Sequence, residues 1–318
     1  MKIKKILAAV TAIALGASLC GCSGGETADS ADKPLIITTI FPAYDFARQV
    51  FGDTAEVRML LKPGQESHSY DPSAKDIVEI NGCDLFVYNG GESDQWVESV
   101  LQAAPDVETF RMTDAVSLLD EEHSEGMQED DHDHDHVDGD EEEYDEHVWT
   151  SPDNAAAIVR ALGSRAKALF PDSAAELDSN TESYAAQIGK IDGRLKELLD
   201  GEERYFIFGD RFPLLYFFKH YGLNYYAAFP GCGSETEPSA QTVTFLLDKL
   251  GQPDAVKAVF CIELSGRKLA DVLAEDSGLD VVEFHSCHNI TADDFAAGET
   301  YVSLMERNLQ TLEKVLVD

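Results

Sequence analysis

Short β-rich runs alternate with helix-length segments along most of the chain, and this alternation restricts the fold more than any other feature of the sequence. Parallel strands joined by helices form a sheet that is covered on both faces, so the pattern predicts an α/β fold. The first series places strands at 34–40, 55–61, 84–90 and 107–112, with helices at 42–52, 73–82 and 94–104.

A second series of the same kind follows two long helical stretches. Residues 151–171 begin with Ser-Pro-Asp and end at a proline, and residues 173–201 contain no strong helix breaker and carry apolar residues at helical spacing. A helix of that length can reach across two domains. We therefore expect two doubly wound parallel-sheet lobes joined by one long rigid helix. The second lobe is expected to contain strands at 204–210, 224–229, 256–263 and 280–285, with helices at 213–222, 239–251, 266–278 and 301–316.

The first 33 residues have the features of an export signal followed by a tether. Three lysines precede the apolar run 6–19, which is too short to span a membrane comfortably. The run ends in Leu-Cys-Gly-Cys, a pattern that favours lipoprotein cleavage before Cys22 and attachment of lipid to its thiol; an ordinary secreted protein is the alternative. The sequence therefore predicts a signal peptide at 1–21, a tether at 22–33, an N-terminal α/β lobe at 34–171 with an acidic His-rich loop at 120–146, a linking helix at 172–201 and a C-terminal α/β lobe at 202–318.

The chain is strongly acidic, with a formal net charge of −36 at pH 7. Residues 120–146 alone contain 16 acids and no Lys or Arg. Such a chain repels nucleic acid and anionic lipid and attracts cations. Within this tract His132, His134 and His136 alternate with acids, and we expect them to collect zinc weakly beside a separate, tighter site.

Four cysteines remain after the predicted cleavage. An exported location permits a disulfide between them, and buried thiols are the alternative. They are Cys83, Cys232, Cys261 and Cys287.

Histidines occur at positions that favour a metal site. His68 lies in the loop after the second predicted strand, and His147 comes just before Trp149 and a helix start. His285 ends the last predicted strand, and His288 follows three residues later. Ligands of parallel sheets lie beyond the carboxyl ends of the strands, so these histidines predict a metal site in a cleft between the lobes. A surface histidine, or a chance pair, is the alternative at each place.

Five segments resemble the zinc- and manganese-specific substrate-binding proteins of bacterial ABC importers. They are KPGQESHSYDPSAKDI, DEHVWTSPDNA, KHYGLNY, ETEPSAQ and GETYVSLMERNLQTL, and they extend over nearly the whole mature chain. The acidic tract lies where the zinc-specific members carry a His-rich loop. In that family the metal lies between two α/β lobes joined by one rigid helix, which agrees with the architecture predicted above.

The resemblance also implies a ligand set. His68 and His147 match the ligands of the first lobe, and the usual C-terminal ligand position falls at His285, with His288 nearby. Where the family usually has a histidine after the strand at 204–210, this chain has Arg211, which cannot ligate a metal. We therefore expect His68, His147 and His285 as ligands, with His288, a water or a carboxylate completing the shell. Arg211 is expected to pair with Asp210, Glu235 or Glu237.

The expected function is that of a monomeric, lipid-anchored extracytoplasmic receptor that delivers Zn²⁺ to an ABC permease and its ATPase, and not that of an enzyme. A site rich in imidazole favours zinc over manganese, so a manganese receptor is the alternative of the same type. A surface metal buffer or adhesin would share the same site. A zinc hydrolase would need a carboxylate base beside an open coordination position, and the sequence contains no HExxH or comparable arrangement.

Overall fold

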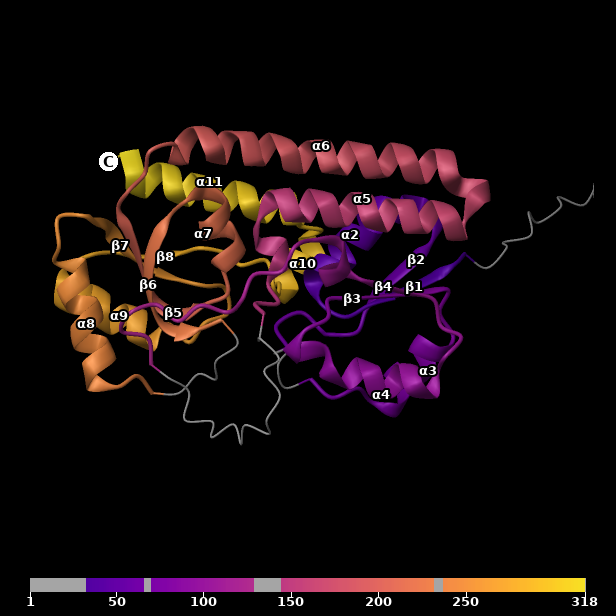
Figure 1. Cartoon of the computed structure of the whole chain (residues 1–318), viewed down its shortest axis with the longest axis horizontal. Coiled ribbons are helices and arrows are strands. Elements are labelled where there is room, and N and C mark those ends of the chain that lie inside the picture. Colours follow the sequence, from indigo (N-terminus) through magenta and orange to yellow (C-terminus); the bar gives the residue numbers. More distant parts are fainter. Residues whose placement is uncertain (1–32, 66–69, 129–143, 232–236, 318) are drawn as a thin grey trace, which may run out of the picture. The chain divides into compact units, whose positions relative to one another are not determined.

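Two four-stranded parallel sheets, one in each lobe, form the framework of the protein (Figure 1). The computed structural model describes residues 33–65, 70–128, 144–231 and 237–317. The strands of the first sheet lie in the order β2-β1-β3-β4 and those of the second in the order β6-β5-β7-β8. The first sheet consists of β1 (Leu35–Thr38), β2 (Glu56–Met59), β3 (Leu85–Tyr88) and β4 (Thr109–Arg111), and the second of β5 (Tyr205–Phe212), β6 (Asn224–Pro230), β7 (Ala255–Cys261) and β8 (Val281–Glu283).

The two sheets therefore share one topology, in which the chain reverses direction across the sheet between the first and third strands. Connections at the carboxyl ends of these strands diverge at that point, which is where doubly wound sheets bind ligands. The helices of the two lobes are α2 (Phe41–Phe51), α3 (Ala74–Asn81), α4 (Gln95–Ala103), α7 (Leu215–Tyr221), α8 (Ala240–Leu250), α9 (Lys268–Ser277), α10 (Ala292–Ala297) and α11 (Tyr301–Val317). The predicted α/β fold of two doubly wound lobes is confirmed.

Several helices begin at residues whose side chains satisfy the exposed backbone N–H groups of the first turn. Ser73 accepts a hydrogen bond from the N–H of Asp76, and the Asp76 carboxylate accepts the N–H of Ser73, which completes a capping box at α3. At the starts of α8 and α10, the side chains of Ser239 and Thr291 accept the backbone N–H of Thr242 and Asp294. The cap of α10, Thr291, lies three residues after the candidate ligand His288.

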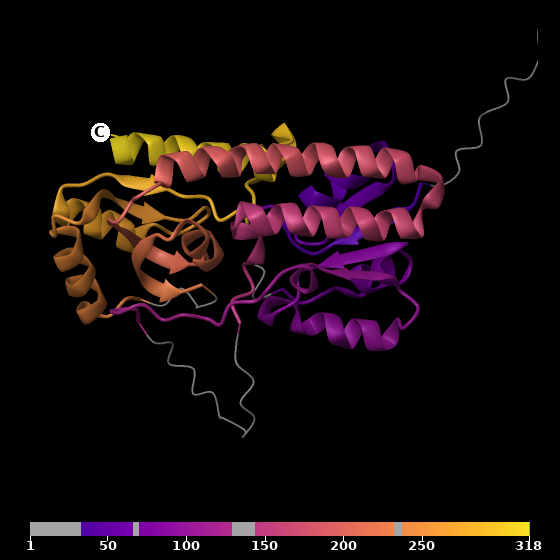
Figure 2. The ribbon, with the colours of Figure 1, turned by 45° about the horizontal axis from the view of Figure 1, so that its top comes forward.

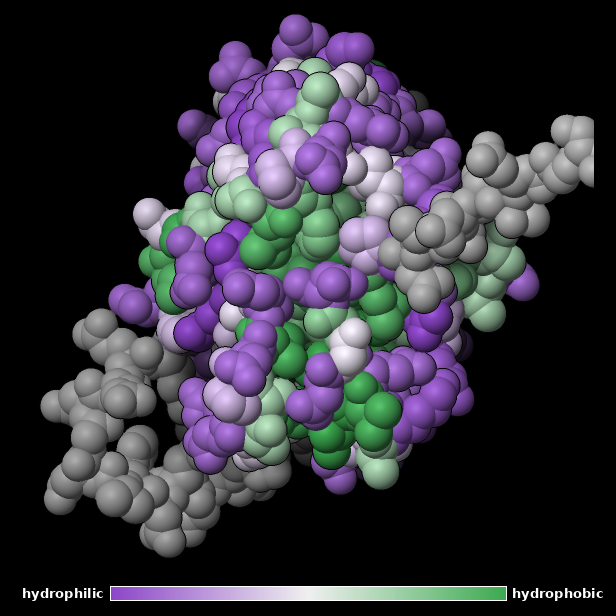
Figure 3. All heavy atoms as spheres, turned by 90° about the vertical axis from the view of Figure 1, so that its right-hand side faces the viewer, coloured by the Kyte–Doolittle hydropathy of each residue, from purple (hydrophilic) through white to green (hydrophobic). Residues whose placement is uncertain are grey.

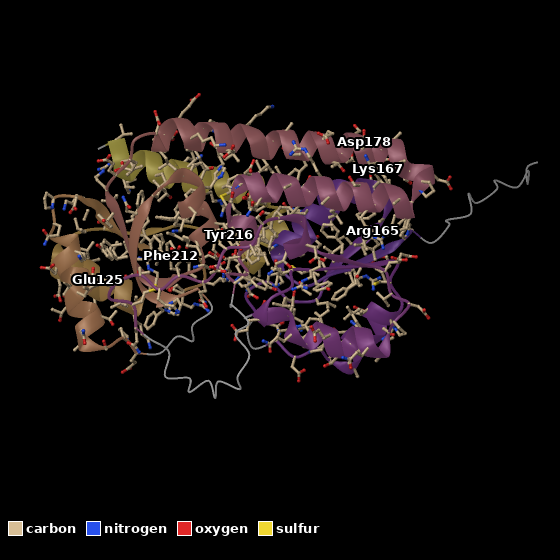
Figure 4. All side chains as sticks on the ribbon, in the orientation of Figure 1. Glu125, Arg165, Lys167, Asp178, Phe212 and Tyr216 are labelled. Carbon is tan, nitrogen blue, oxygen red and sulfur yellow. The ribbon has the colours of Figure 1, made fainter. Side chains whose placement is uncertain are left out.

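A helical hairpin connects the lobes. Its arms are α5 (Pro152–Leu169) and α6 (Ala174–Leu199), and α6 extends past both sheets with α11 beside it (Figures 1 and 2). Lys167 and Asp178, labelled in Figure 4, form an ion pair between the two arms. The two arms pack tightly at Gly163, where a Cβ would lie 2.2 Å from Oγ1 of Thr181, so only glycine fits there without a shift.

One hydrophobic core runs through both lobes. It extends from Ile36 in the first sheet to Phe206 in the second, and Trp149 and Leu195 belong to the same cluster. Consistent with this shared core, Pro34–Asp318 forms one compact unit. The lobes are therefore held together by buried apolar contacts as well as by the helical hairpin.

The segment between β4 and the acidic tract crosses onto the second lobe. The hydroxyl of Tyr216 (Figure 4) accepts the N–H of Leu119 at 3.0 Å and donates to the carbonyl of Asp145 at 2.8 Å. Gln128 donates its backbone N–H to the carbonyl of Ala228 at the edge strand β6. Both ends of the acidic loop are thus attached to the second lobe, while residues 129–143, with His132, His134 and His136, lie outside the described residues.

The outer end of the first lobe is mostly hydrophilic, with apolar side chains gathered in the middle of the face (Figure 3). Among the described residues, no helix combines the length and the apolar character that crossing a membrane requires.

Candidate metal centre

His147 is held in one orientation by the acid two residues before it. Its imidazole is fully buried, its backbone N–H donates to Oδ1 of Asp145 at 2.8 Å, and its ring Nδ1 lies 3.1 Å from the same oxygen. A carboxylate accepts hydrogen bonds, so the proton of the neutral ring lies on Nδ1 and the lone pair on Nε2. This is the arrangement that metal-binding histidines commonly have.

The segment after His147 is anchored by Trp149, which is completely buried. The indole N–H donates to the carbonyl of Ser286 in the second lobe at 3.0 Å, and the carbonyl of Trp149 accepts the hydroxyl of Tyr301 at 2.9 Å. Ser151 then caps α5. Trp149 therefore fixes both the backbone next to His147 and its position relative to the second lobe.

His288 brings a second imidazole to the same place from the other lobe. Its ring centroid lies 5.4 Å from that of His147 and 5.1 Å from that of Trp149. The backbone after β6 also approaches closely here, since a Cβ on Gly231 would lie 3.1 Å from Cε1 of His147. His147 and His288 are the two candidate ligands that the structure brings together.

His285 lies only three residues before His288, but it occupies a different environment. Its Nδ1 accepts the N–H of Cys287 at 2.9 Å and lies 3.6 Å from Oε2 of Glu263. Its Nε2 is buried and has no hydrogen-bond partner among the described residues. With Nδ1 as the acceptor, the proton of the neutral ring is on Nε2. Coordination through Nε2 would require that proton to move to Nδ1, on the side of Glu263.

His68, the other predicted ligand, lies outside the described residues. Within the described ranges, no group of three or more His, Cys, Asp or Glu side chains could hold a metal ion. Of the predicted ligands that the structure describes, His147 and His288 adjoin each other.

Two buried acids of the first lobe, Glu146 and Asp94, lie near His147. Burial raises the pKa of Glu146 to about 7, although its carboxylate accepts the N–H of Ser93 at 3.0 Å. Burial likewise raises the pKa of Asp94 to about 6. For His147, burial disfavours the charged ring, but the nearby carboxylates of Asp145 and Glu146 outweigh it and raise the pKa above its ordinary value. A metal at this ring therefore competes with a proton.

Arg211, which stands where the resemblance implied a histidine, lies within β5. Its backbone N–H donates to Oδ1 of Asp210 at 2.8 Å, and Oδ2 of Asp210 accepts the N–H of Ile262 at 3.0 Å. Burial raises the pKa of Asp210, and the Arg211 guanidinium opposes that rise. Of the expected partners of Arg211, Asp210 contacts it through the backbone N–H and through charge. Glu235 lies outside the described residues.

The described cysteines Cys83, Cys261 and Cys287 are free, and the last two are buried. Cys232 lies outside the described residues. Cys261 and Cys287 are therefore buried thiols, which was the alternative to a disulfide.

Sequence reasoning did not identify Asp145 or Glu263. Asp145 is one of many acids in its segment, so composition does not distinguish it. Glu263 lies two residues after the end of β7 and contacts a loop more than 20 residues later, a relation that no local pattern reveals.

Two relatives of similar sequence are named for zinc. The chain is 31% identical over 316 residues to the zinc-binding lipoprotein AdcA of Streptococcus pneumoniae (strain ATCC BAA-255 / R6), a match that covers 98% of this chain and 60% of AdcA. It is 27% identical over 315 residues to the high-affinity zinc uptake system protein ZnuA of Bacillus subtilis (strain 168), covering 97% of this chain and 96% of that protein. The chain thus spans about 60% of the length of AdcA.

Solved structures show the same fold. The Zn(II)-bound ZnuA-like domain of S. pneumoniae AdcA matches with a TM-score of 0.73 and 28% identity, over 90% of this chain and 100% of that domain. The laminin-binding protein Lmb of Streptococcus agalactiae matches with a TM-score of 0.74 and 21% identity, over 89% of this chain and 99% of Lmb, which shows a shared fold alone. The model of the ZnuA family, the periplasmic component A of the zinc-uptake complex, matches residues 36–315, and this chain therefore belongs to that family.

Proposed function

We propose that this chain is an extracytoplasmic receptor that binds Zn²⁺ between its lobes and delivers it to an ABC permease and its ATPase. The observation that carries the proposal is the approach of His147 and His288, whose ring centroids are 5.4 Å apart although they come from different lobes. Two imidazoles that share one zinc ion, each with a Zn–N bond of about 2.0–2.1 Å, stand at a similar separation.

Membership of the ZnuA family supports this role, and so do the zinc-binding names of the relatives. The donor atoms support zinc over manganese, because imidazole nitrogen suits Zn²⁺ whereas Mn²⁺ prefers oxygen. The role is one of capture and release, for which no enzymatic step is needed.

The proposed ligands are His68, His147 and His288, with His285 as a candidate fourth ligand. His147 offers Nε2, because Asp145 holds the proton on Nδ1. The geometry favours His288 over His285 as the main ligand of the second lobe, since His288 adjoins the His147 ring and His285 has its Nδ1 engaged by Cys287. His285 joins the shell if its proton moves to Nδ1, beside Glu263.

Zinc titration of alanine variants against a chelating dye tests the ligand set. Removal of a ligand should cost more than the roughly 10–100-fold loss typical of supporting residues, so His147→Ala and His288→Ala should each weaken binding by at least about 100-fold. His285→Ala should have a smaller effect. His220→Ala is the matched control, because His220 pairs with Asp192 on α6. Wild-type affinity in His288→Ala would overturn the assignment.

We further propose that lipid on Cys22 anchors the receptor to the cell membrane. The support is the cysteine-containing motif that ends the predicted signal peptide and the lipoprotein name of the AdcA relative. Residues 1–32 lie outside the described residues. Cys22→Ala should move the protein from the membrane fraction to the medium, and retention in the membrane would contradict the anchor.

A further inference from the structure

The loop that carries His288 is wrapped around one buried carboxylate. Glu263 follows the end of β7 and is only 6% exposed. Its Oε2 accepts the N–H of Ser286 at 2.7 Å, and its Oε1 accepts the Ser286 hydroxyl at 2.7 Å. The same Oε1 lies 3.2 Å from the backbone nitrogen of His288 and 3.3 Å from that of Asn289. A single side chain thus collects four donors from three nearly consecutive residues of the loop.

The backbone conformation of this loop depends on such support. Cys287, between Ser286 and His288, has a φ of +60°, a left-handed conformation that residues with a Cβ rarely adopt. Strained backbone of this kind persists only where the surrounding bonds fix it. The bonds to Glu263 on either side of Cys287 supply that constraint, so the direction in which His288 leaves the loop depends on Glu263.

A second attachment connects the same loop to the first lobe. The carbonyl of Ser286 accepts the indole N–H of Trp149, two residues after His147. Ser286 is therefore fixed on one side by Glu263 and on the other by Trp149. The hydrogen bond from Trp149 to Ser286 therefore connects the segment of His147 to the loop of His288 independently of any metal.

The hydrogen bonds of the Glu263 carboxylate come from the loop. The donors that approach it are backbone N–H groups and a hydroxyl of the loop, and Nδ1 of the His285 ring lies 3.6 Å from Oε2. None of the described Lys or Arg side chains forms an ion pair with it. Removal of this carboxylate would therefore leave the N–H groups and the hydroxyl of the loop without their acceptor.

We propose that Glu263 is a positioning residue for zinc: it holds the 285–289 loop so that His288 faces His147 before the metal arrives. This rests on the proposed function, since it takes His288 as a ligand. Glu263 acts through the loop and does not itself touch the metal. Its removal should therefore lower affinity by releasing His288, while a residue of purely structural importance would lower stability alone.

The central experiment is a double-variant cycle on zinc affinity. Glu263→Gln places an amide NH₂ against the donors of the loop and should weaken zinc binding by about 10–100-fold. The same change in a His288→Ala background should cause no further loss, because the effect passes through His288. Glu283→Gln, an exposed acid at the end of β8, is the control for loss of one negative charge.

A spectroscopic readout separates positioning from stability. Co²⁺ loaded in place of zinc reports ligand geometry through its visible absorption. That spectrum should change in Glu263→Gln and stay as in wild type in Glu283→Gln. The thermal midpoint of the metal-free protein, measured in parallel, records any structural cost. An unchanged affinity and an unchanged Co²⁺ spectrum in a Glu263→Gln protein with a lowered midpoint would overturn the proposal.

Ser286→Ala provides a milder test if Glu263→Gln does not fold. It removes the hydroxyl that donates to Oε1 and that accepts the N–H of His288 at 3.2 Å. The change should weaken zinc binding several-fold, again with no added effect in His288→Ala. The outcomes also distinguish the two proposals. Wild-type affinity in His288→Ala would contradict the ligand assignment. If His288→Ala weakens binding and the Glu263 and Ser286 variants lower affinity as much in the His288→Ala background as in wild type, only the positioning proposal is contradicted.

Discussion

His147 combines a fixed proton, a buried aromatic neighbour and two acids within a few residues of chain. The motif around it could be recognised from the sequence, because a histidine beside an aromatic residue and a helix start is a local pattern. Its orienting partner Asp145 could not be singled out, since the segment 120–146 holds 16 acids and composition treats them alike. The preference for His288 over His285 also depends on the coordinates. The His285 ring is engaged by Cys287 and Glu263. The His288 ring adjoins His147 and Trp149.

Glu146 should make the stability of the metal-free protein depend on pH. Burial raises its pKa to about 7 from the model-peptide value of 4.5, so the folded state holds a proton that the unfolded state releases between those values. The unfolding free energy should therefore fall as pH rises from 5 to 7.5, with this residue contributing on the order of 1–3 kcal/mol. Urea denaturation of the metal-free protein at several pH values measures this slope.

Replacing Glu146 by Gln removes the titrating group and should flatten that part of the pH dependence. Glu275→Gln, at an exposed position on α9, is the matched control and should leave the slope as in wild type. Equal slopes in wild type and Glu146→Gln would show that Glu146 is ionised in the folded state at every pH tested.

At the scale of elements, the order of strands and helices followed from periodicity and from residues at helix ends. The predicted long helix 173–201 corresponds to α6, Ala174–Leu199, because no Pro or cluster of Gly interrupts its apolar spacing. The short helix α10 was not expected, since six residues are too few for a periodic signal. The crossing of residues 119–128 onto the second lobe was also unpredictable, because it depends on partners such as Tyr216 and Ala228 that are about 100 residues away.

The packing of α5 on α6 should be sensitive to a single methyl group. A Cβ on Gly163 would lie 2.2 Å from Oγ1 of Thr181, and that hydroxyl is bonded to the carbonyl of Leu177. Gly163→Ala should lower the unfolding free energy by about 1–3 kcal/mol through overpacking. The measurement is chemical denaturation of the metal-free protein.

Gly189→Ala is the control for this variant, because Gly189 lies in α6 and a Cβ there would meet nothing within 4 Å. That change should raise stability by about 0.5–1 kcal/mol, since alanine favours the helix more than glycine does. A Gly163→Ala protein as stable as Gly189→Ala would mean that the two helices separate readily.

At the scale of the whole molecule, two lobes of one topology are joined by a helical hairpin, a shared core and the bond from Trp149 to Ser286. The alternation of strands and helices was sufficient to predict both lobes, and the match to the ZnuA family agrees with that prediction. The proposed metal position depends on side chains from both lobes. Histidines at strand ends predicted a site between the lobes, and the resemblance implied its ligand set. The boundaries at 171, 172 and 201 remain a prediction, since the described lobes form one compact unit.

Anomalous diffraction at the zinc edge, from crystals of the full mature chain loaded with one equivalent of Zn²⁺, tests the central claim most directly. We expect one strong peak between the lobes, about 2.0–2.1 Å from Nε2 of His147 and from a ring nitrogen of His288. His68 should complete the site from its loop. A strong peak that lies away from both His147 and His288, with the two rings free of metal, would contradict the account.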